Sequence, residues 1–345
     1  MDKKLKAAVI GTSRSMGKRH VAAVLAHKDA ELVAICDLDP VALNEAGEEF
    51  GVPAEKRYTN WRDLLEIEGL NVVLLITPDQ LHQEMSETFL EKGIHVMCEK
   101  PLALTREELC GIVRAADKSS AKFMVGQVSR FTDAFIKAKE IVDAGTIGEL
   151  YYVESEYAHD YAKILHAWRA DPNRHGVVGG GCHAVDLLRW IVGDPIEVFA
   201  YGSHKLLPQV TYDDATIAVM KFPNGVVGKV FVSTGCKRPY TMRTLIYGTK
   251  GTIICDNKNS YLTFFTGEEK HPCSTKEWFT IPQEIPVSVA NHNVTSELKM
   301  FLTALLNNEP VAISPMEGAS TVAVCCAVVE SCKTGMPVKV KYPQV

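Results

Sequence analysis

The stretch KAAVIGTSRSMGKRHVAAVLAHKDAELVAICD (residues 6–37) reads as a strand, a glycine-containing turn, a helix and a second strand. The two strand segments, 6–11 and 31–37, are almost entirely apolar, and the segment 17–27 between them has helical spacing of its apolar residues. Strands that are apolar on both faces are typical of a parallel sheet with helices on each side. We therefore predict a βαβ unit here.

The same alternation of strands and helices continues to about residue 125. Apolar runs predict strands at 71–77, 94–99 and 122–127, and helical spacing predicts helices at 40–50, 79–92 and 105–118. Alternating strands and helices of this kind form a parallel sheet wound on both faces. The sequence therefore predicts a doubly wound, Rossmann-type domain over residues 1–125.

Beyond residue 125 the pattern changes to strands in which polar and apolar residues alternate, such as 214–222 and 226–233, which a Pro-Asn-Gly turn joins. Such strands form antiparallel sheets with one covered face. The remaining predicted elements are strands at 149–158, 197–204, 241–248 and 251–256, and helices at 131–144, 294–308 and 315–334. We predict an α/β protein whose second domain, residues 126–345, is α+β with a large, mostly antiparallel open sheet.

Composition and charge exclude several classes of partner. Lys and Arg number 37 against 42 Asp and Glu, giving a net charge of -5 without the basic excess that nucleic-acid binding needs. No apolar run approaches the length of a membrane span or of a signal-peptide core. The ten cysteines include no C-x-x-C pair, so we expect buried thiols rather than disulfides. The expectation is a cytoplasmic protein with no nucleic-acid or membrane partner.

The turn after the first strand has the character of a phosphate-binding loop. It differs from Gly-x-Gly-x-x-Gly in having a serine at the second glycine and one additional residue. It nevertheless follows a buried strand and opens a helix, whose free N–H groups and dipole favour a pyrophosphate. We predict a dinucleotide site whose contacts in this turn are Gly11, Thr12, Ser13, Arg14 and Met16.

An acidic residue at the end of the second strand favours one form of the dinucleotide. Asp37 stands twenty residues after Gly17, where a carboxylate accepts hydrogen bonds from the ribose hydroxyls and repels a 2'-phosphate. Leu38 offers no cation to such a phosphate. These residues predict NAD rather than NADP, although Arg14 in the turn keeps NADP open as an alternative.

Three further segments carry a family resemblance. They are Thr77-Pro78-Asp79-Gln80-Leu81-His82, Glu99-Lys100-Pro101 at a strand end, and Gly179-Gly180-Gly181-Cys182-His183-Ala184-Val185-Asp186. With these segments the chain resembles the Gfo/Idh/MocA family over essentially its whole length. The resemblance implies a two-domain NAD(P)-dependent oxidoreductase that moves a hydride between nicotinamide and a carbinol carbon of a sugar, glycoside or cyclitol. It also implies a homodimer or homotetramer, with one sheet face packed against a second subunit.

The resemblance makes Lys100 the leading catalytic candidate, in contact with cofactor and substrate. Alcohol oxidation needs a base for the hydroxyl proton while hydride leaves the same carbon, and a lysine can be that base where its surroundings favour the neutral amine. Pro101 would fix the backbone, as a cis peptide. The other cofactor contacts expected from these segments are Thr77, Pro78, His82 and Glu99. A further segment that resembles the family, residues 126–131, adds Gln127, which is expected beside the nicotinamide.

His183 is the second catalytic candidate. It lies in the first turn of a predicted helix, where the dipole disfavours the imidazolium, and Asp186 three residues on is expected to hold the ring or a substrate hydroxyl. Many family members have an aspartate four residues before this histidine, at the position of Gly179 here. The choice of base between Lys100 and His183 therefore stays open.

A polar, aromatic segment before the glycines is the predicted substrate wall, because aromatic rings stack on sugars while polar groups bind their hydroxyls. Its predicted contacts are Tyr157, His159, Trp168 and Arg169. The alternative is a solvated loop. His159, Asp160, His166 and His183 have irregular spacing for a metal site, so no metal is predicted.

The leading functional hypothesis is an NAD-dependent dehydrogenase of a sugar, glycoside or cyclitol, acting at the 3-hydroxyl of a glucoside. A second hypothesis is a glycosidase or lyase that oxidises its substrate transiently, eliminates the glycosidic bond and then returns the hydride. A third, which Gly179 favours, is a non-catalytic regulator that binds NAD and sugar.

Overall fold

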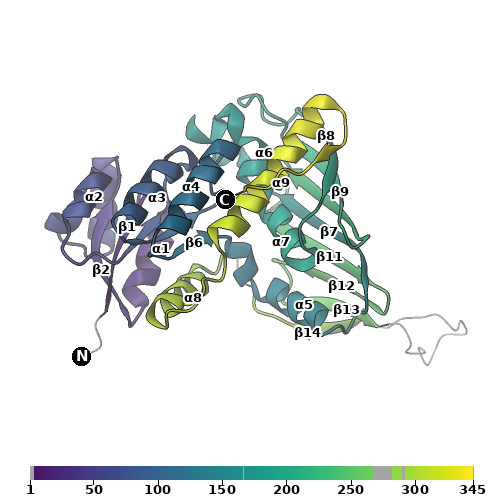
Figure 1. Cartoon of the computed structure of the whole chain (residues 1–345), viewed down its shortest axis with the longest axis horizontal. Helices are drawn as coiled ribbons and strands as arrows, with labels where there is room; N and C mark the ends of the chain where they lie inside the picture. The colour runs from purple at the N-terminus through teal and green to yellow at the C-terminus, as the bar shows by residue number, and fades with distance from the viewer. Residues whose placement is uncertain (1–3, 166, 267–281, 290–291, 345) are drawn as a thin grey trace, which may run out of the picture. The chain divides into compact units, whose positions relative to one another are not determined.

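The computed structural model describes residues 4–165, 167–266, 282–289 and 292–344 (Figure 1). The chain divides into two compact units. Unit 1 contains the residues up to Val128 together with Asn293–Ala319 and the last residues of the chain, and unit 2 contains Ser129–His292 and Ser320–Tyr342. The prediction that everything after residue 125 belongs to the second domain is therefore wrong for Asn293–Ala319, which returns to unit 1.

Unit 1 is built on a six-stranded parallel sheet in the order β3-β2-β1-β4-β5-β6. Its strands are β1 Leu5–Ile10, β2 Ala30–Cys36, β3 Arg57–Tyr58, β4 Val72–Leu75, β5 His95–Glu99 and β6 Phe123–Gly126. The connections change direction between β1 and β4, and in doubly wound sheets ligands bind outside the carboxyl ends of the strands at such a point. The predicted Rossmann fold is confirmed.

The helices of unit 1 are α1 Ser15–Ala26, α2 Pro40–Glu49, α3 His82–Glu91, α4 Arg106–Lys118 and α8 Val294–Leu306. Their ends follow the local sequence. Thr105 and Glu108 form a reciprocal capping box at the start of α4, and Gly51 and Gly93 have φ values of 65° and 72° just beyond α2 and α3. Helix α3 begins three residues later than predicted, because Asp79–Leu81 forms a 3-10 turn.

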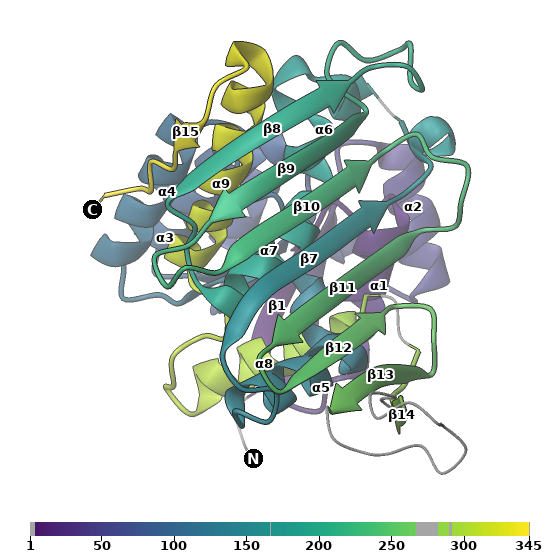
Figure 2. The same ribbon diagram turned by 90° about the vertical axis from the view of Figure 1, so that its right-hand side faces the viewer.

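Unit 2 is built on a nine-stranded sheet in the order β14-β13-β12-β11-β7-β10-β9-β8-β15 (Figure 2). All neighbouring pairs are antiparallel except β7 and β10, which are parallel. Its strands are β7 Leu150–Ala158, β8 Glu197–Ser203, β9 Ala215–Lys221, β10 Val227–Ser233, β11 Thr241–Gly248, β12 Gly251–Asp256, β13 Tyr261–Thr266, β14 Gln283–Pro286 and β15 Val338–Lys339. The predicted large, mostly antiparallel sheet is confirmed.

One face of this sheet carries helices, whereas no helix of the described residues covers the other, open face. Helices α5 (Asp133–Asp143) and α7 (Cys182–Val192) lie behind the sheet in Figure 2. Strand β9 alternates accordingly, with Ala218 and Met220 buried while Ile217 and Val219 are exposed. The pattern is that of a strand with one face in the core.

The remaining helices are short or span the boundary between the units. They are α6 Gly176–Gly179 and α9 Pro315–Thr334, with 3-10 helices at Ala54–Lys56, Trp61–Glu66, Asp79–Leu81, Val128–Phe131, Tyr161–Lys163, Ala167–Ala170 and Pro172–Arg174. Among the described residues, no helix combines the length and the apolar character that crossing a membrane requires.

Candidate active site

The turn between β1 and α1 has the close backbone packing of a phosphate-binding loop. Gly11 has a φ of 93°, and a Cβ atom there would overlap the carbonyl group of Ile76. A Cβ atom at Gly17 would overlap the carbonyl oxygen of Gly11. Arg14 occupies the N-cap position of α1 without a side-chain capping bond. A helix start of this kind has amide groups suited to an anion.

Asp37 connects the end of β2 to the turn after β1. The Asp37 carboxylate, at the end of β2, accepts a hydrogen bond from the Ser13 amide at 2.7 Å and from the Asp39 amide at 3.1 Å. The side chain thus fixes the turn, and each carboxylate oxygen has a further lone pair. These lone pairs suit the ribose hydroxyls of NAD, so this end of the site fits the predicted cofactor.

Buried polar atoms without hydrogen-bond partners lie in the segments that follow β1, β4 and β6. Within the described residues, the Thr12 and Thr77 hydroxyls and both amide atoms of Gln127 make no hydrogen bond. Native proteins rarely leave such groups unsatisfied, because each costs about 1–3 kcal/mol, so they point to a ligand. Together with the turn at Gly11, these predicted residues fit a dinucleotide.

The structure corrects the role predicted for His82. Its ring is fully buried; Nδ1 lies 3.0 Å from the Pro101 carbonyl oxygen, and Nε2 lies 3.2 Å from the Thr77 carbonyl oxygen. His82 was predicted to contact the cofactor. Because both ring nitrogens face backbone carbonyls, His82 instead joins the segment after β4 to the loop after β5.

The loop after β5 carries Lys100, which is half-buried, and the Lys100–Pro101 peptide is cis as predicted. Glu99 is buried; its Oε2 accepts the Lys100 amide at 3.1 Å and its Oε1 lies 3.2 Å from His20 Nε2. Burial opposes ionisation, but the hydrogen bond and charge of His20, with Lys100, hold the pKa of Glu99 below its ordinary value. Glu99 therefore supports the Lys100 backbone from inside the protein, and its predicted contact with the cofactor stays a prediction.

In unit 2, the glycine run brings the start of α7 close to its neighbours. A Cβ atom at Gly180 would overlap the rings of Tyr157 and Tyr161. His183 is 1% exposed, its Nδ1 lies 3.0 Å from the Ser129 hydroxyl, and its ring stacks on Tyr157 with centroids 6.1 Å apart. Two neighbours therefore hold the imidazole in place.

Tyr157 connects His183 to the rest of the predicted substrate wall. Its hydroxyl lies 3.2 Å from His159 Nδ1 and 2.9 Å from the Tyr161 hydroxyl. Burial raises the pKa of Tyr157 and of Tyr240, so both stay neutral hydrogen-bonding groups. Tyr161, which belongs to the predicted polar, aromatic segment but was not singled out, and Tyr240, which follows β10 where no sequence pattern marks a site, join this cluster.

The other predicted wall residues pack among arginines. The guanidinium groups of Arg169 and Arg174 each lie 4.9 Å from the Trp168 ring centroid. A side chain at Gly179 would overlap the Arg174 guanidinium, which is almost completely buried. Any side chain at position 179 would therefore require the Arg174 guanidinium to move. His166, named above as a possible metal ligand, lies outside the described residues.

Asp186 does not have the role predicted for it. It is fully buried and receives Arg130 Nε at 2.7 Å, Arg130 Nη2 at 2.8 Å and the Thr321 hydroxyl at 3.0 Å. Because the carboxylate is fully buried and faces these three donors, it holds neither the His183 ring nor a substrate hydroxyl. Asp186 therefore joins α7 to α9 through Thr321 and to the segment before α5 through Arg130.

Comparison with known proteins gives the family. Residues 5–127 match the family model described as "Oxidoreductase family, NAD-binding Rossmann fold", and residues 135–254 match "GFO/IDH/MocA C-terminal domain". A myo-inositol 2-dehydrogenase of Thermotoga maritima is 27% identical over 98% of this chain and 99% of its own. A levoglucosan dehydrogenase of Pseudarthrobacter phenanthrenivorans is 26% identical over 86% of each chain.

A solved structure shares the fold over nearly the whole length. The levoglucosan dehydrogenase in complex with NADH and L-sorbose has a TM-score of 0.88 and 25% identity, covering 99% of this chain and 100% of that one. The two matched domains lie in unit 1 and unit 2 respectively. The chain belongs to the Gfo/Idh/MocA family and is an NAD-binding oxidoreductase.

Proposed function

We propose that the protein oxidises a secondary hydroxyl group of a sugar, glycoside or cyclitol with NAD. The observation that carries this proposal is the cluster around His183, where the hydroxyls of Ser129 and Tyr157 and the ring of His159 offer hydrogen-bonding groups beside aromatic rings. Such a lining suits an uncharged polyol. The named substrates of the relatives, myo-inositol and levoglucosan, are also polyhydroxylated rings.

The proposed roles follow from the chemistry of alcohol oxidation. Lys100 takes the hydroxyl proton, and His183 holds a substrate hydroxyl through its imidazole. NAD, when bound, accepts the hydride from the same carbon, so a ketone and NADH are formed. Asp37 binds the adenosine ribose, and Thr77 and Gln127 bind the nicotinamide end.

The experiment that tests the proposal is absorbance at the NADH band while the protein is offered NAD with free sugars, inositols, levoglucosan and glucosides. We expect saturable NADH formation with one of these classes, with the 3-hydroxyl of a glucoside as the first position to examine in the product. NADP is offered in parallel, and Asp37→Ser is expected to reduce the preference for NAD because it removes the carboxylate that repels a 2'-phosphate. No NADH formation with any polyol would contradict the proposal.

The same samples distinguish transient from net oxidation. In the eliminating reaction, the hydride returns to the substrate, so a glycoside is cleaved without net NADH. Chromatography of the products would detect that cleavage. Cleavage without any rise in absorbance at the NADH band would favour the glycosidase or lyase over the dehydrogenase.

We propose further that a second copy of the chain covers the open face of the unit 2 sheet. Tyr201 on β8 pairs in register with Ile217 on β9, and these side chains and Val219 are 65%, 43% and 45% exposed. An apolar patch of this kind marks an interface. Val219→Glu is expected to lower the mass measured by sedimentation to that of the monomer, whereas a monomeric wild type would contradict this proposal.

The proposed location is the cytoplasm. The cysteines that the structure describes are free, as is usual for proteins of reducing compartments. Cys273 lies outside the described residues.

A further inference from the structure

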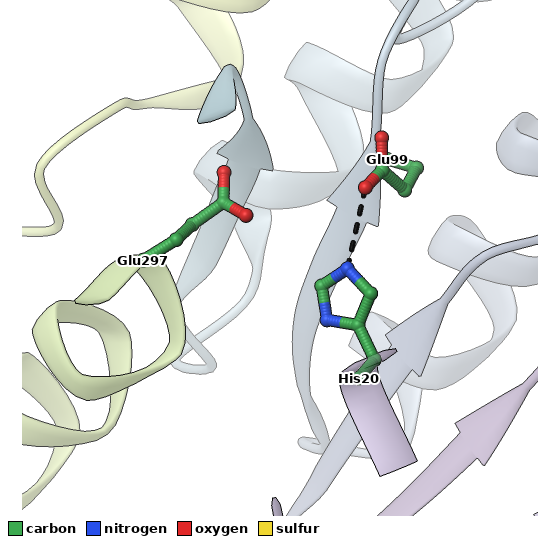
Figure 3. Close-up of side chains that lie close together, drawn as sticks. All are labelled: His20, Glu99 and Glu297. Carbon is green, nitrogen blue, oxygen red and sulfur yellow. Dashed lines mark hydrogen bonds and ion pairs between the residues drawn. The ribbon is translucent and has the colours of Figure 1, made fainter. Parts of the chain in front are cut away.

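Three titratable side chains meet in the interior of unit 1, behind the loop that carries Lys100. They are His20 from α1, Glu99 from the end of β5 and Glu297 from α8, and one ligating atom of each lies within 4.8 Å of the others. Figure 3 shows the Glu297 carboxyl group pointing from α8 towards the other two side chains. His20 and Glu297 are fully buried, and Glu99 is 8% exposed. We call these three residues the buried acid cluster.

The two glutamates of the cluster have unequal surroundings. Glu99 is bonded by the His20 ring at 3.2 Å and by the Lys100 amide at 3.1 Å. Neither carboxyl oxygen of Glu297 has a hydrogen-bond partner among the described residues, and neither does His20 Nδ1. The Glu99 carboxyl group is thus stabilised as an anion, whereas the Glu297 carboxyl group is not.

The surroundings of the two carboxyl groups determine which of them is ionised. An ionised carboxylate that is buried without donors is strongly unfavourable, and a nearby negative charge makes it more so. Burial, followed by the charge of Glu99, raises the pKa of Glu297 well above its ordinary value. Among the described residues, His20 and Lys100 lower the pKa of Glu99, and the charge of Glu99 in turn raises the pKa of the buried Cys98 thiol next to it. Two carboxyl groups so close together hold a single negative charge, as paired carboxyl groups generally do.

We propose that Glu297 is a neutral carboxylic acid in the native protein and that, through Glu99, it is a positioning residue for Lys100. Its O–H group supports the Glu99 carboxylate across one water molecule, and that carboxylate accepts a hydrogen bond from the Lys100 amide. The role in catalysis rests on the function proposed above for Lys100. The protonation of Glu297 does not depend on that function.

A divalent cation is the competing occupant of the cluster, because two carboxylates and an imidazole form an acceptable ligand set. The geometry favours a proton on Glu297 over a cation bound by the three side chains. His20 Nε2 and Glu99 Oε1 are hydrogen-bonded to each other rather than directed at a common centre. A cation would also need an entry path to a fully buried site. Metal analysis of the purified protein decides the matter: a stoichiometric divalent metal that is lost in Glu297→Gln would overturn the proposal.

The direct test is infrared spectroscopy of the full-length protein at neutral pH. A neutral carboxylic acid has a C=O stretch resolved from those of carboxylates and amides. We expect this band in the wild type, its loss in Glu297→Gln, and its retention in Glu45→Gln, which removes an exposed glutamate of α2. A wild-type spectrum without the band, or a band that survives in Glu297→Gln, would refute the neutral acid.

The pH dependence of unfolding gives a second readout that needs no substrate. A glutamate is ionised above about pH 4.3 in the unfolded chain but stays protonated in the fold, so wild-type stability is lost as pH rises from there towards the folded pKa. Glutamine cannot ionise. The unfolding constant of the wild type relative to Glu297→Gln should therefore rise about tenfold per pH unit in this range. A ratio that is constant with pH contradicts the proposal.

The positioning role is tested by activity once a substrate is known. Glu297→Gln keeps a neutral donor and should leave the pH at which kcat/KM is half-maximal unchanged, whereas Glu297→Leu removes the donor and should lower kcat more than it changes KM. If Glu297 were ionised, the glutamine variant would remove a charge near Lys100 and shift the profile. Equal kcat in the leucine variant and the wild type would exclude positioning while leaving the infrared result intact.

Discussion

Lys100→Ala should lower kcat for polyol-dependent reduction of NAD by about 10²- to 10⁴-fold, the usual effect of removing a general base. The side chain stands on a loop that the structure fixes from both sides, with Glu99 on the Lys100 amide and His82 on the Pro101 carbonyl oxygen. Binding of NAD, followed by nucleotide fluorescence, should change little, because the turn at Gly11 and the Asp37 carboxylate are retained.

Two further variants test whether the loss of activity in Lys100→Ala comes from the missing base. Lys100→Arg keeps a positive charge but does not release its proton near neutral pH, so it should be nearly as inactive as the alanine variant. Lys92→Ala removes an exposed lysine after α3 and should have wild-type kcat. If Lys100→Ala retained most of the activity while His183→Ala abolished it, His183 would be the base.

Asp186→Ala should lower the free energy of unfolding by about 3–5 kcal/mol, because it leaves the Arg130 guanidinium buried without its carboxylate. The guanidinium donates two hydrogen bonds to Asp186, at 2.7 and 2.8 Å, and Asp186 is fully buried. The loss is measured as the change in the denaturant midpoint, with the slope of the transition as a check on unchanged unfolding behaviour.

Matched variants separate this ion pair from an ordinary one. Asp143→Ala removes the partner of Lys139 on the exposed side of α5, and such surface pairs contribute about 0–1 kcal/mol. Arg130→Met combined with Asp186→Leu should recover much of the loss, since replacing a whole buried pair by apolar residues is often neutral. If Asp186→Ala lowered the free energy of unfolding no more than Asp143→Ala does, the buried ion pair would not stabilise the fold as described here.

The parts of the fold that sequence predicts well are those with strong local signals. Helix α2 begins at Pro40 and α4 at the Thr105 cap, and Gly51 and Gly93 follow α2 and α3, because these residues act within one turn. Strands β3 and β15 were not predicted, because each is only two residues long and is defined by its pairing partner. The return of Asn293–Ala319 to unit 1 also depends on distant packing rather than on any local pattern.

In the site, as in the fold, sequence spacing predicts features set by nearby residues and misses those set by residues far along the chain. The spacing of Gly11, Gly17 and Asp37 predicts a dinucleotide turn from local sequence alone, since all three act within one βαβ unit. The role predicted for Asp186 was wrong, because spacing places it on the same helix face as His183 but cannot reveal Arg130, 56 positions away. Glu297 did carry a usable signal: it is an acidic residue on the apolar face of its helix, three residues after Val294 and four before Phe301.

The most direct test of the account uses the polyol that gives the fastest NADH formation, labelled with deuterium at the carbinol carbon. Mass spectrometry of the nucleotide after turnover by the wild type should find one deuterium in NADH, and the Lys100→Ala variant should form this product about 10²- to 10⁴-fold more slowly. Reduced nucleotide without the label, or no reduced nucleotide with any polyol while NAD is bound, would contradict hydride transfer from a carbinol carbon.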